Sequence, residues 1–514
     1  MSPTPAPLQS QTEYTSTLVN RLWSYCELLR HSGVSTLDYV EQLTYLLFLK
    51  MADEKTNRPA RFQRRSTGVE RIVPEGKDWP SLMTRSAEPL IEQYEHILWE
   101  LGQRPGTMLG EVFLKAQNKI HEPAVLERLI KDLIGKYTWN REDIDLKGDA
   151  YEGLLQRGAE DRKTGAGQYF TPRPLIDAMV DCLEPQLGES ITDPACGTGG
   201  FLIAAYAYLV EHYESELFSD AGRRLQTGAI TGYELVRETA RLALMNMLLH
   251  GIGSSEGKPL ITVQDSLAKS PIVFHDIVLA NPPFGVGSVT GEAYGARSDF
   301  WATTTNKQLN FVQHIYTLLK TNGRAAVVLP DNVLFEGGAG AEIRRKLLDT
   351  CNVHTLLRLP TGIFYAGGVK ANVLFFDRPG PRHDGSPATK QLWVYDFRTD
   401  QRFTLKQRPL KREHLDDFVK AYKSGNGDHQ NRIASAHFKP YSYEELIKRD
   451  KVNLDLTVLQ DSKAGCSSIA SPDVIAQEIV DDLTDALAEF TIVAEALKAA
   501  RRTANPGDEG DDAA

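Results

Sequence analysis

The sequence lacks long apolar runs, a leader-like start and a cysteine framework. No stretch of about 18 apolar residues occurs, so we expect no membrane span. The beginning, MSPTPAPLQSQTEY, has neither the basic nor the apolar region of a secretory signal. Cysteines without CxxC spacing argue against a zinc site and favour reduced thiols in the cytoplasm. The five are scattered along the chain: Cys26, Cys182, Cys196, Cys351 and Cys466.

The chain also lacks an excess of basic residues. It has 58 Lys and Arg against 68 Asp and Glu, which gives a formal net charge of −10. A protein that grips a nucleic-acid backbone alone usually carries a basic excess or a basic stripe. If this chain acts on nucleic acid, we expect a partner protein to supply much of the binding affinity.

The pattern along the chain predicts several domains, as the length of 514 residues also does. Helical periods without strand signal come first, at 37–51, 87–102 and 122–137. A region in which strands and helices alternate follows. After about residue 400 the signal weakens, but an amphipathic stripe runs from Val474 to Leu497. We expect disordered tails at 1–13 and 503–514, a helical domain at 14–145, an α/β domain at 146–400, and a C-terminal region with an amphipathic helix for a partner at 401–502.

Short β-branched runs alternate with helical stretches from about Ser190 onward. Strands are predicted at 190–193, 229–234, 260–265, 275–280, 324–330, 353–360 and 370–377. No helix separates the last two, so we expect an antiparallel pair there. The pattern predicts an α/β fold with a doubly wound, mostly parallel, Rossmann-like sheet and an antiparallel edge.

Acidic residues stand at three successive strand ends, where ligands bind in open α/β sheets. In DPACGTGGFL, Asp193 leaves its strand before a glycine-rich turn and a helix start, which let a ligand approach the backbone closely. The turn is neither GxGxxG nor a P-loop, so it favours a cationic or polar small ligand. Glu234 could accept from a ribose diol and Asp265 from an adenine amino group. Together they indicate an adenosine-containing ligand.

The fourth strand ends in Asn281-Pro282-Pro283-Phe284, where two prolines prevent its continuation. A nucleobase amine is a poor nucleophile because its lone pair delocalises into the ring. Two rigid acceptors, the Asn281 amide oxygen and the Pro282 carbonyl, could localise that pair by accepting both N–H hydrogens. Phe284 could stack on a base taken out of the duplex. The motif therefore predicts a pocket for an everted base.

These motifs together resemble the DNA amino-methyltransferases that use S-adenosylmethionine. QYFTPR at 168–173 precedes DPACGTGG, and NPPF follows, which is the order of the gamma class of adenine methyltransferases. Further stretches resemble the modification subunit of type I restriction-modification systems. They are LLFLKMADE (46–54), AYEGLLQRGAEDRKTGAGQYFTPR (150–173), MNMLLHGI (245–252), LANPPFG (279–285) and GRAAVVLPDNVLF (323–335).

The resemblance implies site-specific N6-adenine methylation of DNA, with S-adenosylmethionine as methyl donor and no metal. It implies a target-base pocket made by Asn281, Pro282 and Phe284. It implies cofactor contacts from Gln168, Tyr169, Phe170, Thr171, Pro172, Arg173, Asp193, Thr198, Gly199, Gly200, Glu234 and Asp265.

The resemblance also implies partners. These are double-stranded DNA and a specificity subunit flanked by two modification subunits, with restriction motor subunits as further members of the complex. The C-terminal helices would pack against the specificity subunit, and the complex would work in the cytoplasm of a bacterium or archaeon. By itself the chain is expected to bind DNA weakly and to methylate poorly.

Three other functions stay open at this point. A cytosine N4-methyltransferase is chemically close, although serine is commoner there in place of Asn281. A protein glutamine methyltransferase uses the same NPP-aromatic device, but it would not need the helical N-terminal domain. A scaffold that has lost activity is the third.

Two further glycine-rich stretches are interpreted as loops. We read residues 285–308 as a loop that orders over DNA, and 335–345 as a helix-entry loop rather than a nucleotide site.

Overall fold

The computed structural model describes most of the chain up to Val458. By contacts the chain divides into the units Met1–Val458 and Leu459–Ala514, and the described residues lie in the first. The predictions for Gln168–Phe170, the loop residues 285–296, the helix at 474–497 and both tails lie outside the described residues. The described residues are 36–56, 71–139, 171–284, 297–364, 370–382, 384–398, 403, 408–425, 429 and 431–458.

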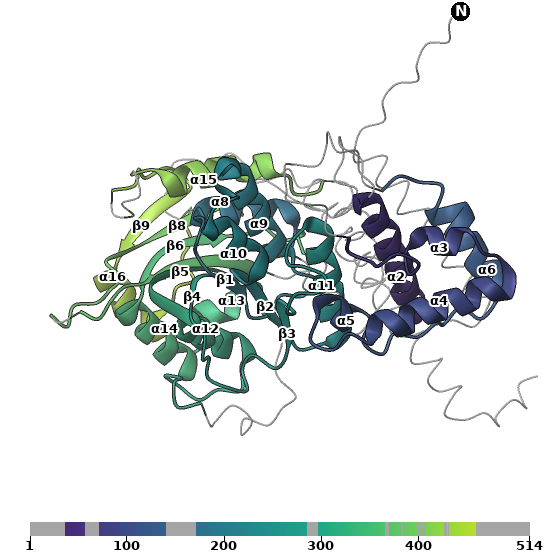
Figure 1. Cartoon of the computed structure of the whole chain (residues 1–514). Coiled ribbons are helices and arrows are strands. Elements are labelled where there is room, and N and C mark those ends of the chain that lie inside the picture. The colour runs from purple at the N-terminus through teal and green to yellow at the C-terminus, as the bar shows by residue number, and fades with distance from the viewer. Residues whose placement is uncertain are drawn as a thin grey trace, which may run out of the picture. The chain divides into compact units, whose positions relative to one another are not determined.

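The N-terminal part is helical, as predicted (Figure 1). Aromatic and aliphatic side chains fill its core: Tyr45 stacks on Phe113 at 5.3 Å, and Phe48 meets the same ring edge-on. The stretch predicted as one helix at 122–137 begins as an α-helix and continues as a π-helix. The elements are α2 (Thr36–Thr56), α3 (Trp79–Met83), α4 (Ala87–Gly102), α5 (Met108–Val112), α6 (Pro123–Glu127) and η2 (Arg128–Ile134).

The second part of the described chain is built on one mixed sheet with the order β3-β2-β1-β4-β5-β7-β6-β8-β9. From β3 to β5 all pairs are parallel, whereas β7 runs antiparallel to both β5 and β6. This confirms the predicted fold class. The strands are β1 (Ile191–Asp193), β2 (Ile230–Glu234), β3 (Ile261–Val263), β4 (His275–Ala280), β5 (Leu319–Pro330), β6 (Asn352–Arg358), β7 (Ala371–Arg378), β8 (Gln391–Asp396) and β9 (Phe438–Ser442).

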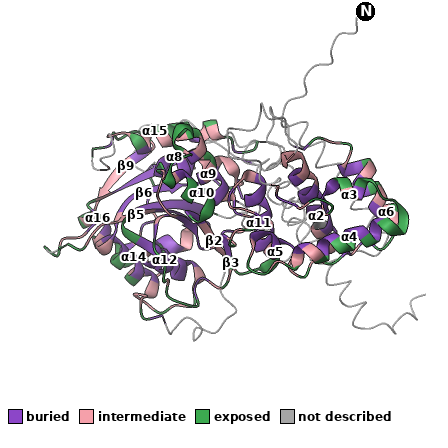
Figure 2. Ribbon diagram, viewed as in Figure 1, coloured by how far each residue is buried: buried purple, intermediate pink, exposed green. Residues whose placement is uncertain are grey.

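Helices cover both faces of the sheet, so its strands are buried (Figure 2). Along β4, Ile277 and Leu279 belong to one apolar core, whereas Val278 and Ala280 belong to the other. This alternation is the period-two pattern of a strand with two covered faces. One core takes α8 (Arg173–Leu183), α9 (Gly200–His212) and α11 (Arg237–His250); the other takes α12 (Lys307–Leu318) and α14 (Ala339–Thr350).

The remaining described elements are shorter. They are α10 (Asp220–Thr227), α13 (Asp331–Phe335), α15 (Asp416–Lys423), α16 (Tyr443–Lys448) and the 3₁₀ turns Glu214–Glu216, Arg412–Leu415 and Asp450–Val452. In the part of the chain that the structure describes, we find no helix long and apolar enough to cross a membrane.

Two parts of the sheet differ from the prediction. β5 begins at Leu319, directly after α12, rather than at residue 324, because Leu319 pairs with His275 across an irregular register. The strands β8 and β9 were not predicted, and β9 contains Pro440, which is tolerated because the strand lies at the edge. The sheet therefore continues past residue 400, where the sequence signal weakens.

The helical N-terminal part is joined to α11 and the loop after it by polar contacts. The buried Arg241 of α11 forms an ion pair with Glu41 of α2 and donates to the Leu114 carbonyl at 3.1 Å. The backbone N–H of Met108 donates to the Gly257 carbonyl at 2.7 Å. These bonds fix the helical part against the side of the sheet that carries β2 and β3.

Candidate active site

The carboxyl ends of the parallel strands meet at one edge of the sheet, which we call the carboxyl edge. β1 lies between β2 and β4, so the chain passes to opposite sides of β1 and creates a switch point. Ligands of open α/β sheets bind in the crevice at such a point. The predicted acidic residues follow β1, β2 and β3 there, and the Asn281 motif follows β4 directly beside β1.

The turn after β1 needs glycine at two positions. Gly197 and Gly199 adopt φ values of +55° and +85°, a left-handed conformation that other residues adopt only with strain. Gly199 is the residue before α9, and Arg173 Nη1 donates to the carbonyl of Gly200 at 3.0 Å. Asn246 of α11 donates to the carbonyl of Thr198 at 3.2 Å. The turn is thus tightly held between α8, α9 and α11.

The carboxylate of Glu234 is tied to the same turn. It accepts hydrogen bonds from the backbone N–H of Gly197 at 3.0 Å and from that of Val236 at 2.9 Å. A carboxylate has about four acceptor positions, so it can accept further bonds from a ligand. The amide of Gly197 therefore faces Glu234 rather than a ligand.

Asp193 is buried at the base of this turn. Only 1% of its surface is exposed, and it accepts from the backbone N–H of Ala195 at 2.9 Å. Burial raises the pKa of Asp193 to about 8, and the nearby Glu234 acts in the same direction. Burial also raises the pKa of Glu234. Two acidic groups crowded in this way are suited to a ligand that brings positive charge.

Asp265 lies two residues beyond β3, on the same edge. Its Oδ1 accepts from the backbone N–H of Leu267 at 2.9 Å. The next residue, Ser266, donates to the Pro194 carbonyl at 2.6 Å, which ties this turn to the turn after β1. The three acidic residues predicted to act together are therefore on linked turns.

The amide of Asn281 is oriented by Thr171. Both residues are 7% exposed, and Asn281 Nδ2 donates to Thr171 Oγ1 at 2.8 Å. The amide oxygen is therefore turned away from Thr171. Gln308 at the start of α12 donates to the Pro283 carbonyl at 3.3 Å and holds the same turn from the other side.

Phe284 has an aromatic partner that the sequence reasoning missed. Its ring lies 6.4 Å from the ring of Phe364, with an interplanar angle of 64°. Phe364 is buried and follows β6, whose neighbour β7 lies beside β5. The sequence signal that could have found Phe364 is its place shortly after a strand end, in LPTGIF. The strand before it, β6, is not adjacent to β4 in the chain or in the sheet, so the sequence did not connect Phe364 with Phe284.

Pro172 and Pro282 each stand directly beside a residue of the candidate site. Pro172 is the residue before α8 and has a φ of −56°. Its fixed φ sets the direction in which the chain passes from Thr171 into the helix at Arg173. Pro282 is buried and follows Asn281 directly. The structure thus brings together the described members of the predicted cofactor and base sites along one edge.

A buried charged network lies at the same edge, near the end of β5, and was not predicted. Arg358 is 1% exposed and forms ion pairs with Asp331 at 3.4 Å and with Asp455 at 2.5 Å. Asn372 donates to Asp331 at 2.8 Å. The network connects the end of β6 to the last described segment of the chain.

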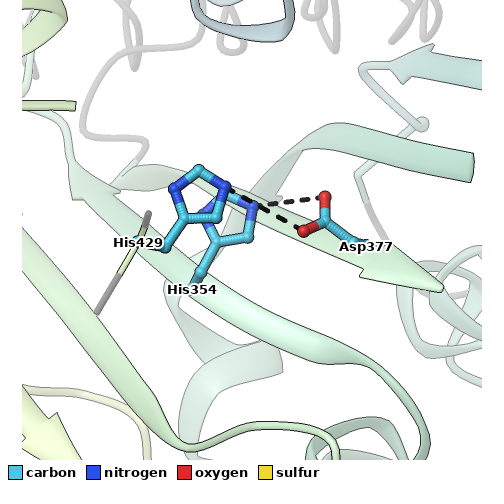
Figure 3. A group of neighbouring side chains, drawn as sticks. All are labelled: His354, Asp377 and His429. Atoms are coloured by element: carbon cyan, nitrogen blue, oxygen red, sulfur yellow. Dashed lines mark ion pairs between the residues drawn. The ribbon is translucent and has the colours of Figure 1, made fainter. Parts of the chain in front are cut away.

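A group with possible metal ligands lies at the opposite edge, near the start of β6 and the end of β7 (Figure 3). The rings of His354 and His429 are stacked 3.8 Å apart, and their Nε2 atoms lie 3.5 and 4.0 Å from the Asp377 carboxylate. Two imidazoles and a carboxylate are a donor set that zinc accepts.

The hydrogen bonds of the two rings oppose metal binding. Arg432 can only donate, and its Nη2 lies 2.6 Å from His429 Nδ1, so the proton of that neutral ring sits on Nε2. Burial, helped by His354 and Arg432, lowers the pKa of His429 to about 3 and keeps it neutral. Thr355 accepts from Arg432 at 2.6 Å and can donate to His354 Nδ1 at 2.8 Å. Both Nε2–H groups then face Asp377, so we interpret the group as a structural link.

Comparison with known proteins agrees with the geometry of the carboxyl edge. Residues 142–464 match the family model for N-6 DNA Methylase, and residues 18–133 match that for the HsdM N-terminal domain. The chain is 38% identical to the StySPI methylase subunit of Salmonella potsdam, with 96% of each chain covered. It is also 38% identical to the EcoKI methylase subunit of Escherichia coli K12, over 92% of this chain and 94% of that one.

Solved structures give the same result. A modification subunit of a putative type I restriction enzyme from Vibrio vulnificus YJ016 has a TM-score of 0.70 and 25% identity, covering 87% of this chain and 95% of that one. The EcoKI M protein has a TM-score of 0.52 and 34% identity, covering 96% and 98%.

The chain belongs to the N-6 DNA methylase family. Within that family it is a methylase subunit of the type I restriction-modification kind, and its activity is adenine N6-methylation of DNA. The comparisons thus favour adenine over the cytosine and glutamine alternatives, and an enzyme over an inactive scaffold.

Proposed function

We propose that the carboxyl edge transfers a methyl group from S-adenosylmethionine to the N6 amine of an adenine turned out of the duplex. The observation that carries the proposal is the Asn281 amide, whose nitrogen is bound to Thr171 while its oxygen is turned away. This places a fixed acceptor beside the end of β1, where the acidic residues lie.

The described residues fit the methyl donor on three counts. At Gly197 a Cβ atom would meet no other atom within 4 Å, so the left-handed turn leaves open space beside the backbone for a ligand. The buried Asp193 is suited to the ammonium group of the methionine part, because positive charge there would favour its ionised form. Glu234 would accept from the ribose hydroxyls and Asp265 from the adenine amine of the cofactor. When bound, S-adenosylmethionine supplies an electrophilic methyl group on its sulfonium.

The residues after β4 prepare the acceptor. The Asn281 amide oxygen and the Pro282 carbonyl accept the two N6–H hydrogens and draw the nitrogen lone pair out of the ring. Phe284, supported by Phe364, stacks on the everted base. With the methyl donor bound, the N6 nitrogen would take the methyl group from the sulfonium, which would leave as the neutral thioether, and the N6 nitrogen would lose one proton to solvent.

The acidic balance of the chain supports work within a complex. With a net charge of −10, the chain alone offers little attraction for the DNA backbone. We propose that one specificity subunit reads the DNA sequence between two copies of this chain, and that restriction motor subunits can join them. Its compartment would be the cytoplasm.

Co-expression with a specificity subunit tests this assignment. The chain is expressed in a methylation-free host, either alone or with the specificity protein encoded beside it, and methylated bases are mapped along the host genome. We expect N6-methyladenine at one bipartite sequence only when both proteins are present. Equal methylation by the chain alone would contradict the partner assignment, and methylation of cytosine would contradict the assigned base.

A further inference from the structure

The short segment from Thr171 to Arg173 contacts both halves of the candidate active site. Thr171 Oγ1 accepts from Asn281 Nδ2 at 2.8 Å, and Arg173 Nη1 donates to the Gly200 carbonyl at 3.0 Å. Asn281 belongs to the proposed base pocket, whereas Gly200 is the first residue of α9, directly after the glycine turn. Only Pro172, with its restricted φ, separates the two contacts.

The orientation of the Asn281 amide decides what the site can do. The two ends of an asparagine amide have almost the same shape, but one end accepts hydrogen bonds and the other donates them. A half-turn of the amide would place its NH₂ against the NH₂ of adenine. Two donors would then face each other, and the lone pair of the base would not be localised.

The Thr171 hydroxyl is placed to hold the Asn281 amide in the orientation that the structure has, with Nδ2 toward the hydroxyl and the oxygen away from it. The contact is buried, and it joins residues 110 positions apart in the chain. In a buried pair of this kind water does not compete, so one hydrogen bond has a large effect on which rotamer is populated. Arg173 holds the same segment against the glycine turn, so the acceptor oxygen and the cofactor turn share one rigid connection.

We propose that Thr171 is a positioning residue for methyl transfer, which sets the Asn281 amide with its oxygen toward the base. The inference rests on the proposed function of the carboxyl edge and adds to it a residue that acts through Asn281. It departs from the role expected from the family resemblance, in which Thr171 contacts the cofactor.

The test is the single-turnover rate of methyl transfer in the assembled complex, with S-adenosylmethionine and DNA both saturating. Thr171→Val keeps the shape of the side chain but loses the hydroxyl, whereas Thr171→Ser keeps the hydroxyl. We expect Thr171→Val to slow transfer about tenfold, the effect of one hydrogen bond, and Thr171→Ser to stay within about threefold of wild type. Cofactor affinity should change in neither.

A matched control separates positioning from general loss of structure. Thr192→Val removes another buried hydroxyl, in β1, which accepts a long hydrogen bond from Thr231 at 3.4 Å, and should leave the transfer rate near wild type with at most a small loss in the melting temperature of the complex. Asn281→Asp supplies a second test, because a carboxylate presents oxygen in either orientation. In that background, Thr171→Val should lose most of its effect on the rate, as expected for two residues that act as one unit.

The outcomes separate this inference from the proposed function. A wild-type transfer rate for Thr171→Val, together with an inactive Asn281→Ala, overturns the role of Thr171 and leaves the proposed function standing. Weaker cofactor binding with an unchanged transfer rate would make Thr171 a cofactor contact and also overturn the inference. A wild-type rate for Asn281→Ala overturns the proposed function itself.

Discussion

The backbone N–H of Gly197 donates to the carboxylate of Glu234 across 3.0 Å, so the glycine turn after β1 is fastened to the end of β2. The same carboxylate accepts from the N–H of Val236. One side chain therefore shapes the cofactor turn and is also the group proposed to hold the ribose. Loss of this carboxylate should affect both cofactor affinity and local structure.

For Glu234→Ala we expect at least tenfold weaker binding of S-adenosylmethionine, measured by calorimetry. The reason is the loss of the ribose acceptor, together with about 1–3 kcal/mol for a backbone N–H left without its acceptor. Glu234→Gln keeps one acceptor oxygen and should lose less. Unchanged affinity in the alanine variant would remove Glu234 from the cofactor site.

Asp193 should make cofactor binding depend on pH. Burial raises its pKa to about 8 in the protein without ligand, so below that pH the carboxyl is protonated, and a cationic ligand must displace the proton. Affinity should therefore rise with pH and level off above about pH 8, with proton release on binding. Calorimetry in buffers of different ionisation enthalpy measures the released proton.

Asp193→Asn is the matched control for this pH dependence, because it keeps the shape but cannot ionise. Binding of S-adenosylmethionine should weaken, and the proton release due to Asp193 should disappear. Any titration of the cofactor's own amino group should remain. A pH profile identical to that of wild type would contradict the assignment of Asp193 to the ammonium group.

The Phe284–Phe364 pair should support the everted base. Phe284→Ala removes the stacking face, and since base–aromatic stacking contributes about 1–3 kcal/mol, transfer should slow roughly ten- to hundredfold. Phe284→Tyr keeps the ring and should be nearly as active as wild type. Fluorescence of 2-aminopurine at the target position measures eversion directly, and full eversion with alanine at 284 would be the contrary result.

The contact between Arg241 and Glu41 should hold the helical part on α11. Arg241 is buried but Glu41 is about one-third exposed, so Arg241→Met should cost roughly 1–3 kcal/mol, less than a fully buried pair. Glu41→Gln, which keeps the hydrogen-bonding shape, should cost less. Thermal unfolding and limited proteolysis of the chain measure the effect; an unchanged melting temperature for Arg241→Met would contradict this account.

Two buried histidines should make the fold sensitive to acid. Burial lowers the pKa of His275 to about 4 and that of His314 to about 3, whereas an unfolded histidine titrates near 6.5. The folded pKa values are depressed, so the unfolded state binds more protons below about pH 6.5, and stability is lost as pH falls toward 4. Each histidine contributes up to about 1.4 kcal/mol per pH unit.

Denaturation at pH 7 and pH 5 measures this loss, and His275→Phe is the variant to compare. The stability of the His275→Phe variant at pH 7 can differ from that of wild type. Its free energy of unfolding should nevertheless fall less between pH 7 and pH 5 than that of wild type. An equal loss in both proteins would show that His275 is not responsible.

The sequence predicted some elements fully and others not at all. The helix at Ala87–Gly102 and the strand at His275–Ala280 have the predicted limits, because their apolar residues follow one period and their ends carry clear signals. β9 was missed because Pro440 and four half-buried positions leave no alternating pattern. Edge strands are defined by their neighbours more than by their own residues.

For the site, strand ends were predictable and side-chain partners were not. Asp193, Glu234 and Asn281 could be found because each ends a strand whose apolar run is readable. The bonds from Gly197 to Glu234 and from Asn281 to Thr171 join residues 37 and 110 positions apart. Such pairs depend on the packing of α8 against α9 and β5 and on the pairing of β2 with β1, which no local pattern encodes.

The central claim is that Asn281 presents an oxygen to an everted adenine beside the methyl donor. Transfer of isotope-labelled methyl from S-adenosylmethionine to target DNA, by the complex of this chain with its specificity subunit, tests it most directly when the labelled nucleoside is identified. The account predicts label on adenine N6 with the wild-type chain, and a rate at least about a hundredfold lower with Asn281→Ala. Label on another base, or a wild-type rate with alanine at 281, would contradict it.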